Sequence, residues 1–346
     1  MKDNPKKKRY FPPEWAPQSG VQLTFPHANT DWSPYLDEAT NCFNQIARAV
    51  SSREKLIAVL QNDGDEHRLL AGCNLDNVLI VRADSNDTWA RDHGGITVFE
   101  NNLPRMLDFT FNGWGKKFSA EKDNCLTHAL FCKGCFGDDV SYENRLDFVL
   151  EGGSIESDGN GTLLTTADCL LSKNRNDSLS KAEIEQYLAE AFGVSRVLWL
   201  QHGFLAGDDT DSHIDTLARF CDARTIAYVK CEDKTDMHYD AMKRMEDELR
   251  QFRTIEGAPY RLAPLPMADP MFDDGDRLPA TYANFLIING AVLMPAYNSA
   301  KDAAARAALA RVFPDREIVA IDCSVLVRQH GSLHCVTMQY PEGVLR

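Results

Sequence analysis

The sequence predicts an α/β fold in which helices and short strands alternate along 346 residues. Helical stretches lead repeatedly into β-rich runs, and these runs begin near residues 56, 197, 260 and 318, at intervals of roughly 60 residues with one interval about twice as long. The hydrophobic fraction of 44% and charged fraction of 25% are typical of a globular protein. No low-complexity linker divides the chain, so we expect a single domain over residues 1–346.

Each expected helix has its own start and stop signals. The first is expected from Ser33, as N-cap, with Pro34 at its first position, to about residue 48. The second begins at Ser180, where Glu183 completes a capping box, and ends at Gly193. Two more are expected at 239–252 and 301–312. These four helices lead into strands expected at 56–60, 197–200, 260–265 and 317–321.

A further helix at 118–130 would complete a series of five helix-and-strand units. Such a series is compatible with a closed, repeated architecture. The alternative is an open α/β sheet without symmetry, and the periodicity does not decide between the two. Asn289-Gly290 separates two β-rich runs and predicts a type I′ hairpin turn.

Charge and composition restrict the partners and the compartment. A net charge of −14 argues against a nucleic-acid partner. The ten cysteines lack the dense spacing of a small secreted scaffold, and the basic segment 6–9 is followed by Pro12 and Pro13 instead of an apolar run. No run of about 18 apolar residues occurs. We therefore expect a cytoplasmic protein without a membrane partner, and a homo-oligomer is left open.

Cys335 and His213 are the candidate nucleophile and general acid/base. A thiolate attacks electron-poor carbon while an imidazole transfers protons. His334 precedes Cys335, and neighbours on a strand face opposite ways, so His213 is the better partner. A strand over 212–220 would place His213 and Asp215 on one face, where the acid would orient the base. The ordinary alternatives are a buried core cysteine and a polar surface strand.

Carboxylates elsewhere could grip a planar cation such as a guanidinium. Asp92 lies in segment 87–95, where Trp89 could stack on the cation and two glycines allow close backbone approach. Glu151 ends an apolar run, directly before two glycines, as at the edge of an active site. The ordinary alternatives are a turn with a core tryptophan and a plain strand end. Cys132 and Cys135 form a lone CxxC, which is weak support for zinc or redox chemistry.

Eight segments occur in the order found in one enzyme family: 12–15, 25–26, 87–95, 111–115, 151–153, 207–215, 284–290 and 331–339. Together they resemble the agmatine deiminase and bacterial-type peptidylarginine deiminase family. The resemblance implies a pentein fold, a five-bladed α/β propeller of pseudo-fivefold repeated ββαβ-type units. It also implies a small-molecule guanidinium substrate and no metal or organic cofactor.

The resemblance further implies roles for individual residues. Cys335 would be the nucleophile and His213 the acid/base, Asp92 and Glu151 would bind the guanidinium, and Asp215 would support the reacting end. The pocket would be lined by Trp89, Trp114 and Asp209. The chain departs from the family pattern at Gly94-Gly95 and, beside the nucleophile, at 329–332.

The expected reaction is hydrolysis of agmatine to N-carbamoylputrescine and ammonia through a cysteine thiouronium intermediate, a step in putrescine biosynthesis. The acidic segment 208–211 favours agmatine, whereas Arg91 could pair with the carboxylate of an arginine. Alternatives are a peptidylarginine deiminase, an amidinotransferase and a non-catalytic propeller that only binds. A papain-like protease is disfavoured because its cysteine precedes its histidine in the chain.

Overall fold

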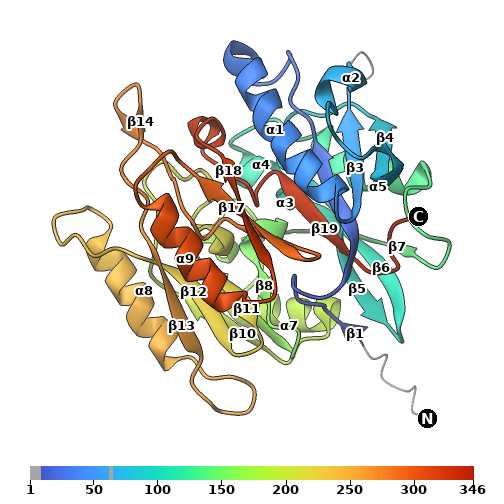
Figure 1. Cartoon of the computed structure of the whole chain (residues 1–346). Coiled ribbons are helices and arrows are strands. Elements are labelled where there is room, and N and C mark those ends of the chain that lie inside the picture. The colour runs from blue at the N-terminus through green and yellow to red at the C-terminus, as the bar shows by residue number, and fades with distance from the viewer. Residues whose placement is uncertain (1–8, 62–64) are drawn as a thin grey trace, which may run out of the picture.

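The computed structural model describes residues 9–61 and 65–346 and has a mixed α/β fold (Figure 1). The basic residues 6–8, used above to argue against a signal peptide, lie outside the described residues. Among the described residues, no helix is both long and apolar enough to cross a membrane.

The strands form several small sheets instead of the single open sheet considered above. The first sheet has the order β19 (Thr337–Pro341), β2 (Gln18–Thr24), β3 (Lys55–Leu60) and β4 (Val78–Arg82). The second has the order β1 (Arg9–Tyr10), β5 (Ile96–Glu100), β6 (Leu103–Thr110) and β7 (Ser141–Val149).

Three sheets of three strands follow along the chain. They contain β8 (Glu156–Ser157), β9 (Thr162–Thr166) and β10 (Arg196–Leu200); β11 (Ala218–Asp222), β12 (Thr225–Lys230) and β13 (Arg261–Pro266); and β16 (Leu286–Ile288), β17 (Ala291–Ala296) and β18 (Glu317–Asp322). A small ribbon pairs β14 (Phe272–Asp273) with β15 (Asp276–Arg277).

All five larger sheets share one pairing scheme. A central strand pairs antiparallel with one neighbour and parallel with the next, as in β11–β12–β13. Because parallel strands need a crossover, a helix joins each parallel pair. Five pairs are joined by α1 (Leu36–Ser51), α5 (Leu126–Cys132), α7 (Lys181–Phe192), α8 (Tyr239–Gln251) and α9 (Asp302–Val312), and the short α2 (Glu66–Leu69) joins the sixth pair, β3 and β4. Short helices α3 (Ala90–His93), α4 (Gly113–Lys116) and α6 (Ala167–Leu170) also lie in connections.

Helices α7, α8 and α9 match the sequence prediction closely, whereas α1 is shifted by three residues and the helix expected at 118–130 covers only Leu126–Cys132. The details of two turns also differ. The capping box of Ser180 and Glu183 and the left-handed Gly193 (φ 70°) are confirmed. Ser33 is not an N-cap, because the chain enters α1 through a 3-10 turn in which no side chain caps the helix. Asn289-Gly290 does make a hairpin, but only Gly290 has a positive φ (73°), so the turn is not type I′.

The two ends of the chain meet in the first sheet. Strand β19, near the C-terminus, pairs antiparallel with β2 near the N-terminus, and Figure 1 shows β19 in red beside the blue strands. Buried apolar side chains fill the space between sheets and helices, among them Phe43, Phe220 and Phe285. The turn that precedes β19 is thereby fixed against the body of the protein.

The capping box of α7 gives a test of the fold. Replacing Ser180 by Ala removes the side-chain acceptor of the Glu183 N–H and should lower the free energy of unfolding by about 1 kcal/mol. The exposed Ser178, just outside the helix, is the matched control, and Ser178→Ala should change it by less than about 0.5 kcal/mol. Urea denaturation of both variants measures the difference, and equal midpoints would contradict the cap.

Candidate active site

Cys335 lies in the turn that leads into β19 and is only 5% exposed. Its thiol donates to the side-chain oxygen of Asn284 at 3.3 Å, and its Sγ lies 4.0 Å from Asp215 Oδ2. The sulfur borders a cavity of about 680 Å³. Other residues that line this cavity include Trp89, Trp114, Asp31, Asp92, Asp208 and Asp209. A buried thiol thus meets a strongly acidic cavity with aromatic walls.

Asp92, on α3, is held from two sides. The Trp114 indole N–H donates to its Oδ2 at 3.0 Å, and the Gly153 backbone N–H donates to its Oδ1 at 3.1 Å. Burial raises the pKa of Asp92 to about 6, against the lowering effect of the nearby His213. The carboxylate is therefore fixed in position and carries its charge at neutral pH.

His213 and Asp215 do not lie on a strand, which corrects the sequence prediction. They flank and enter a 3-10 turn, Ile214–Thr216, and β11 begins only at Ala218. The preceding residues Asp211 and Ser212 have φ of 65°, and the Ser212 N–H donates to Asp208 Oδ2 at 2.7 Å. This tight loop prevents extension of the strand.

The same turn still directs both side chains to one place. A Cβ built on Gly153 would lie 2.7 Å from His213 Nδ1, 2.9 Å from Asp92 Oδ1 and 3.2 Å from Asp215 Oδ2. Gly153 is therefore the point where three predicted site residues converge, and a larger residue there would displace them.

His213 lies behind Asp92, with its Nδ1 3.7 Å from Asp92 Oδ1. Both ring nitrogens lack a hydrogen-bond partner within the described residues. Burial alone would lower the pKa of His213, but the charges of Asp92, Cys169 and Glu151 raise it to about 10. These negative charges therefore favour the protonated form of the ring. The ring does not itself line the cavity, whereas the neighbouring Asp92 does.

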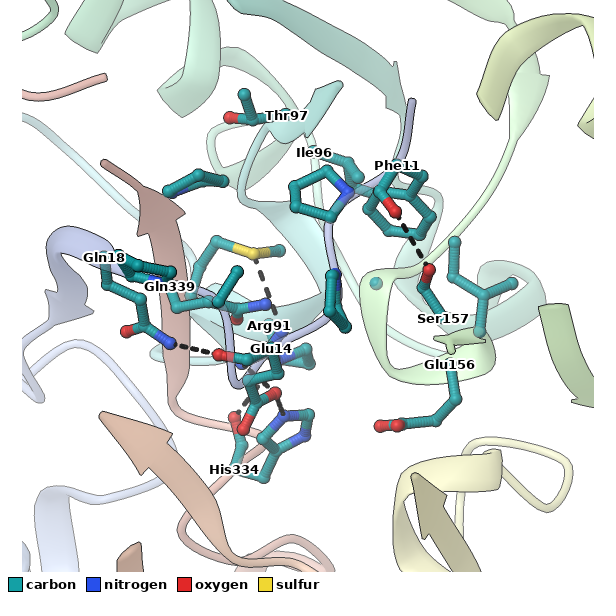
Figure 2. Close-up of a pocket in the computed structure, with 18 residues that line it drawn as sticks. Phe11, Glu14, Gln18, Arg91, Ile96, Thr97, Glu156, Ser157, His334 and Gln339 are labelled. Atoms are coloured by element: carbon teal, nitrogen blue, oxygen red, sulfur yellow. Dashed lines mark hydrogen bonds and ion pairs between the residues drawn. The ribbon is translucent and has the colours of Figure 1, made fainter. Parts of the chain in front are cut away.

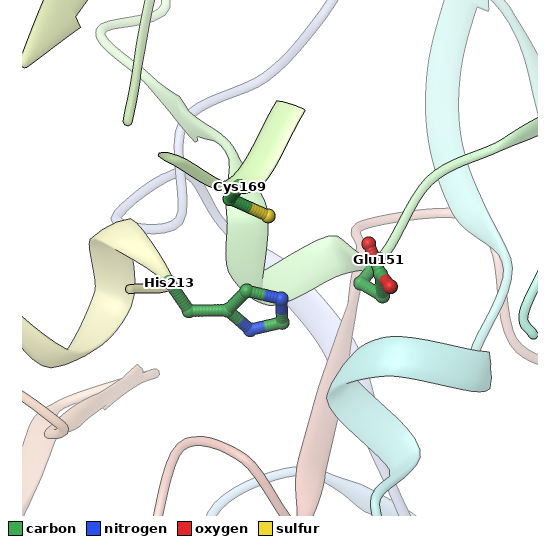
Figure 3. Close-up of side chains that lie close together, drawn as sticks. All are labelled: Glu151, Cys169 and His213. Atoms are coloured by element: carbon green, nitrogen blue, oxygen red, sulfur yellow. The ribbon is translucent and has the colours of Figure 1, made fainter. Parts of the chain in front are cut away.

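Glu151 has a different partner from the one expected. Its two carboxylate oxygens accept from Arg175 Nε at 3.0 and 2.9 Å, and both side chains are fully buried. Figure 3 shows Glu151 and the Cys169 thiol close to the His213 ring. The atoms of these three residues that could bind a metal ion all lie within 4.8 Å of one another. Such a trio could hold a metal ion, but Arg175 already supplies the cation that this carboxylate needs.

The aromatic walls are fixed by hydrogen bonds. Asp87 accepts from the indole N–H groups of both Trp32 and Trp89, each at 2.9 Å. The Trp89 and Trp114 rings meet edge to face, with centroids 6.3 Å apart and planes at 77°. Gly331 lies so close to Trp89 that an added Cβ would come within 2.1 Å of the ring.

Asp209 lies at the outer part of the cavity, with 39% of its side chain exposed. Lys117 holds its loop by donating to the Asp209 carbonyl at 2.6 Å and to Asp211 at 2.8 Å. His330, in the segment that departs from the family pattern, lies 3.8 Å from Asp209 and bonds the Gly207 carbonyl at 2.6 Å. The segment 329–332, which departs from the family pattern, thus lies at the rim of the cavity.

The CxxC pair lies apart from this cavity. Cys132 is exposed, Cys135 is buried, and neither forms a disulfide. The Cys132 sulfur lies 3.6 Å from His128 Nε2.

Sequence reasoning missed Asn284, Arg175, Asp87 and the pair Glu14 and His334, which contacts Asp215. Asn284 and Glu14 fall inside segments of the family pattern, so the sequence pointed to their positions but did not predict which side chains they contact. Arg175 gave no signal, because its partner Glu151 is 24 residues away and ion pairing has no local pattern.

Comparison with known proteins identifies the family. The model of the Porphyromonas-type peptidyl-arginine deiminase family matches residues 10–341. The chain belongs to this family. The agmatine deiminase of Stutzerimonas stutzeri is 31% identical over 366 residues, which cover 97% of this chain and 96% of that protein.

Two solved structures are closer in sequence. A Porphyromonas gingivalis protein provisionally named an arginine deiminase is 56% identical, with a TM-score of 0.95 over 98% of this chain and 100% of that chain. A cysteine-to-serine variant of the Campylobacter jejuni (C. jejuni) agmatine deiminase, with substrate bound, is 39% identical, with a TM-score of 0.91 over 98% of each chain.

The contact between Gly331 and Trp89 can be tested directly. Gly331→Ala should push the indole or the 329–332 segment out of place and lower kcat/KM by about 10- to 100-fold, as expected for a displacement of about 1 Å in a site. Gly137 is the matched control, since its added Cβ would meet no atom nearer than 3.5 Å. Both variants are compared by steady-state kinetics, and an unimpaired Gly331→Ala enzyme would refute the close packing.

Proposed function

We propose that the protein is an agmatine deiminase, which converts agmatine and water to N-carbamoylputrescine and ammonia. The observation that carries this proposal is a buried cysteine, Cys335, placed beside Asp92 and Asp215 at an acidic cavity with tryptophan walls. Relatives over nearly the whole chain are named agmatine deiminases, and one such enzyme has substrate bound in a cysteine-to-serine variant.

Asp92 and Asp215 form the guanidinium clamp in this proposal. Asp215 is fully buried, and its Oδ1 has no hydrogen-bond partner within the described residues. Burial would raise the pKa of Asp215, but the hydrogen bond and charge of His334 and the charge of His213 lower it. A charged, unsatisfied acceptor is what a guanidinium N–H needs. Glu151 was the expected second member, but Arg175 occupies its oxygens, so we assign Glu151 to orienting and charging His213.

The chemistry then follows in two halves. The Cys335 thiolate attacks the guanidinium carbon, His213 donates its proton to the departing nitrogen, and the C–N bond breaks to release ammonia. This leaves a thiouronium cation on the sulfur. Water attacks the same carbon and loses one proton to His213. The C–S bond then breaks while the remaining hydroxyl proton passes to solvent, so the neutral ureido product leaves with the thiolate and the imidazolium restored.

The bound cation also makes the thiolate available. Burial and the charges of Asp215 and Asp92 raise the pKa of Cys335 well above its ordinary value when the site holds no cation. A guanidinium between these carboxylates reverses the local charge and lowers the cost of the thiolate.

The walls of the cavity favour agmatine over arginine. Among the described residues that line it there are five aspartates and no lysine or arginine. The carboxylate of free arginine would lie among like charges, whereas the primary amine at the other end of agmatine is a cation that suits Asp208 and Asp209. Trp89 and Trp114 would contact the alkyl chain.

Peptidylarginine remains the second candidate, because the family model carries that name and the outer rim near Asp209 is partly exposed.

The finer architecture is part of the same proposal. The five sheets with one pairing scheme would close as a five-bladed α/β propeller in a single domain, and the pairing of β19 with β2 supports such closure. A cytoplasmic location would bring the enzyme to a metabolic substrate.

Substrate and nucleophile are tested together. Purified protein is given agmatine, free arginine and an arginyl peptide, and ammonia and ureido product are measured. Agmatine should have the highest kcat/KM, and Cys335→Ala should lose all turnover while its thermal unfolding is unchanged. Cys132→Ser, at an exposed cysteine far from the cavity, should retain wild-type turnover. Turnover of the peptide alone would defeat the agmatine assignment, and product formed only with an amine acceptor would indicate an amidinotransferase.

The pKa of Asp92 predicts the acid limb of the rate profile. Because the clamp needs the charged carboxylate and burial raises the pKa of Asp92 to about 6, kcat/KM should fall as pH is lowered through about 6. Trp114→Phe removes a hydrogen bond that lowers this pKa, so the limb should move to higher pH by about 0.5 to 1 unit.

Trp199 is the control for this shift, since its indole bonds Glu185 away from the cavity. Trp199→Phe should leave the limb in place. A limb that moves to lower pH in Trp114→Phe would contradict the role of the indole.

A further inference from the structure

Neighbouring residues in two motifs face two different cavities. Asp92 and Cys335 line the acidic cavity, whereas Arg91 and His334 line a second cavity of about 610 Å³. Figure 2 shows Glu14, Arg91 and His334 together in this second cavity. Among the described residues the two cavities share no lining residue, and Asp215 Oδ2 contacts both His334 Nδ1 and Cys335 Sγ, at 2.6 and 4.0 Å.

The His334 ring joins two carboxylates across this layer. Its Nδ1 lies 2.6 Å from Asp215 Oδ2 and its Nε2 lies 2.8 Å from Glu14 Oε2. An ionised carboxylate only accepts hydrogen bonds, so both ring nitrogens must carry a proton. Burial and the charges of Arg219 and Arg91 lower the pKa of this ring, which is 2% exposed, whereas Glu14 and the hydrogen bond to Asp215 raise it. While both carboxylates are charged, the two short contacts favour the doubly protonated ring.

Glu14 is itself fixed by separate parts of the chain. Arg219 donates to its Oε2 at 2.8 Å, and the Ile287 backbone N–H donates to its Oε1 at 2.7 Å. Burial would raise the pKa of Glu14, but the charges of Arg219, His334 and Arg91 lower it. Glu14 therefore stays charged and holds the Nε2 proton of His334.

A metal ion is a less suitable explanation for this cluster. Glu14, Glu156 and His334 have ligand atoms within 4.8 Å of one another. However, Arg219 donates to both carboxylates, so its guanidinium already fills the position of a cation.

We propose that Glu14 and His334 are a positioning pair for the deimination, which holds Asp215 by its Oδ2 so that its Oδ1 remains free to accept from the guanidinium. This inference rests on the proposed function. The charged and titratable groups that face the pair and Asp215 are Arg91, Arg219, Glu156, His213, Asp92 and Cys335. The pair makes no contact with the acidic cavity, so it acts through Asp215 alone.

The second cavity allows a chemical-rescue experiment. His334→Ala opens a space that is continuous with this cavity, so a small imidazole can enter. The variant should lose about 10- to 100-fold in kcat/KM with agmatine, the range for an outer group that orients a reacting one. Imidazole and 4-methylimidazole, which carry two N–H groups as cations, should restore most of the loss. The equally large 1-methylimidazole has one N–H group and cannot bridge both carboxylates, so it should restore little.

A second variant guards against misfolding of His334→Ala. Glu14→Gln keeps the shape and removes the charge that holds the Nε2 proton, and it should also lose about 10-fold in kcat/KM with no response to imidazole. Wild-type protein with each imidazole is the control for general solvent effects. Wild-type kcat/KM in either variant, or equal rescue by 1-methylimidazole, would overturn the proposal.

A labelling assay separates this inference from the choice of substrate. The rate at which a cationic chloroacetamidine alkylates Cys335 is divided by the rate for neutral iodoacetamide, with both read by peptide mass spectrometry. His334→Ala should lower this ratio about 10-fold, because the cation loses an oriented carboxylate. An unchanged ratio would overturn the positioning role. If wild-type protein is inactive with agmatine but His334→Ala still lowers the labelling ratio, only the substrate assignment is overturned.

Discussion

The proposed active site depends on keeping two buried carboxylates, Asp92 and Asp215, charged beside a buried thiol. A buried ion is costly unless hydrogen bonds and opposite charges offset its loss of hydration. Asp92 receives the Trp114 and Gly153 N–H groups and faces the His213 imidazolium. Asp215 accepts a hydrogen bond from Nδ1 of His334. Asp215 Oδ1 keeps its acceptor capacity and Asp92 lines the acidic cavity, so in the proposed mechanism a planar cation completes these contacts.

The fold supplies these contacts from segments that are distant in sequence. Asp92 comes from α3, His213 and Asp215 from the turn before β11, and Cys335 from the turn before β19. Pairing of β19 with β2 fixes the last of these turns. The sulfur lies between Asn284 and Asp215, and burial with the charges of Asp215 and Asp92 raises the pKa of the Cys335 thiol, so in the proposed mechanism the thiol stays protonated until a cation binds. The same arrangement therefore accounts for both reactivity and selectivity toward guanidinium compounds.

The sequence predicted the long helices better than it predicted local conformation, and the roles of the site residues stay predictions, although the structure brings Asp92, His213 and Asp215 together around Gly153. Helix α7 was correct at both ends, because its capping box and Gly193 are local signals. The strand expected over 212–220 was wrong, because Asp208 folds the loop through contacts that alternation of residue types does not report. Glu151 was expected at the guanidinium, and only the structure shows Arg175 on its oxygens. Buried ion pairs such as His334 with Glu14 join residues 320 apart and have no pattern in sequence.

The central claim is that one sulfur, at Cys335, bonds to the substrate carbon during turnover. Protein mixed with agmatine should be quenched in acid within one turnover and digested, and its cysteine peptides weighed. The account predicts a transient mass increase equal to agmatine less ammonia on the peptide that contains Cys335, absent from the peptide that contains the neighbouring site thiol Cys169. An adduct on Cys169, or rapid turnover with no adduct on any cysteine, would contradict it.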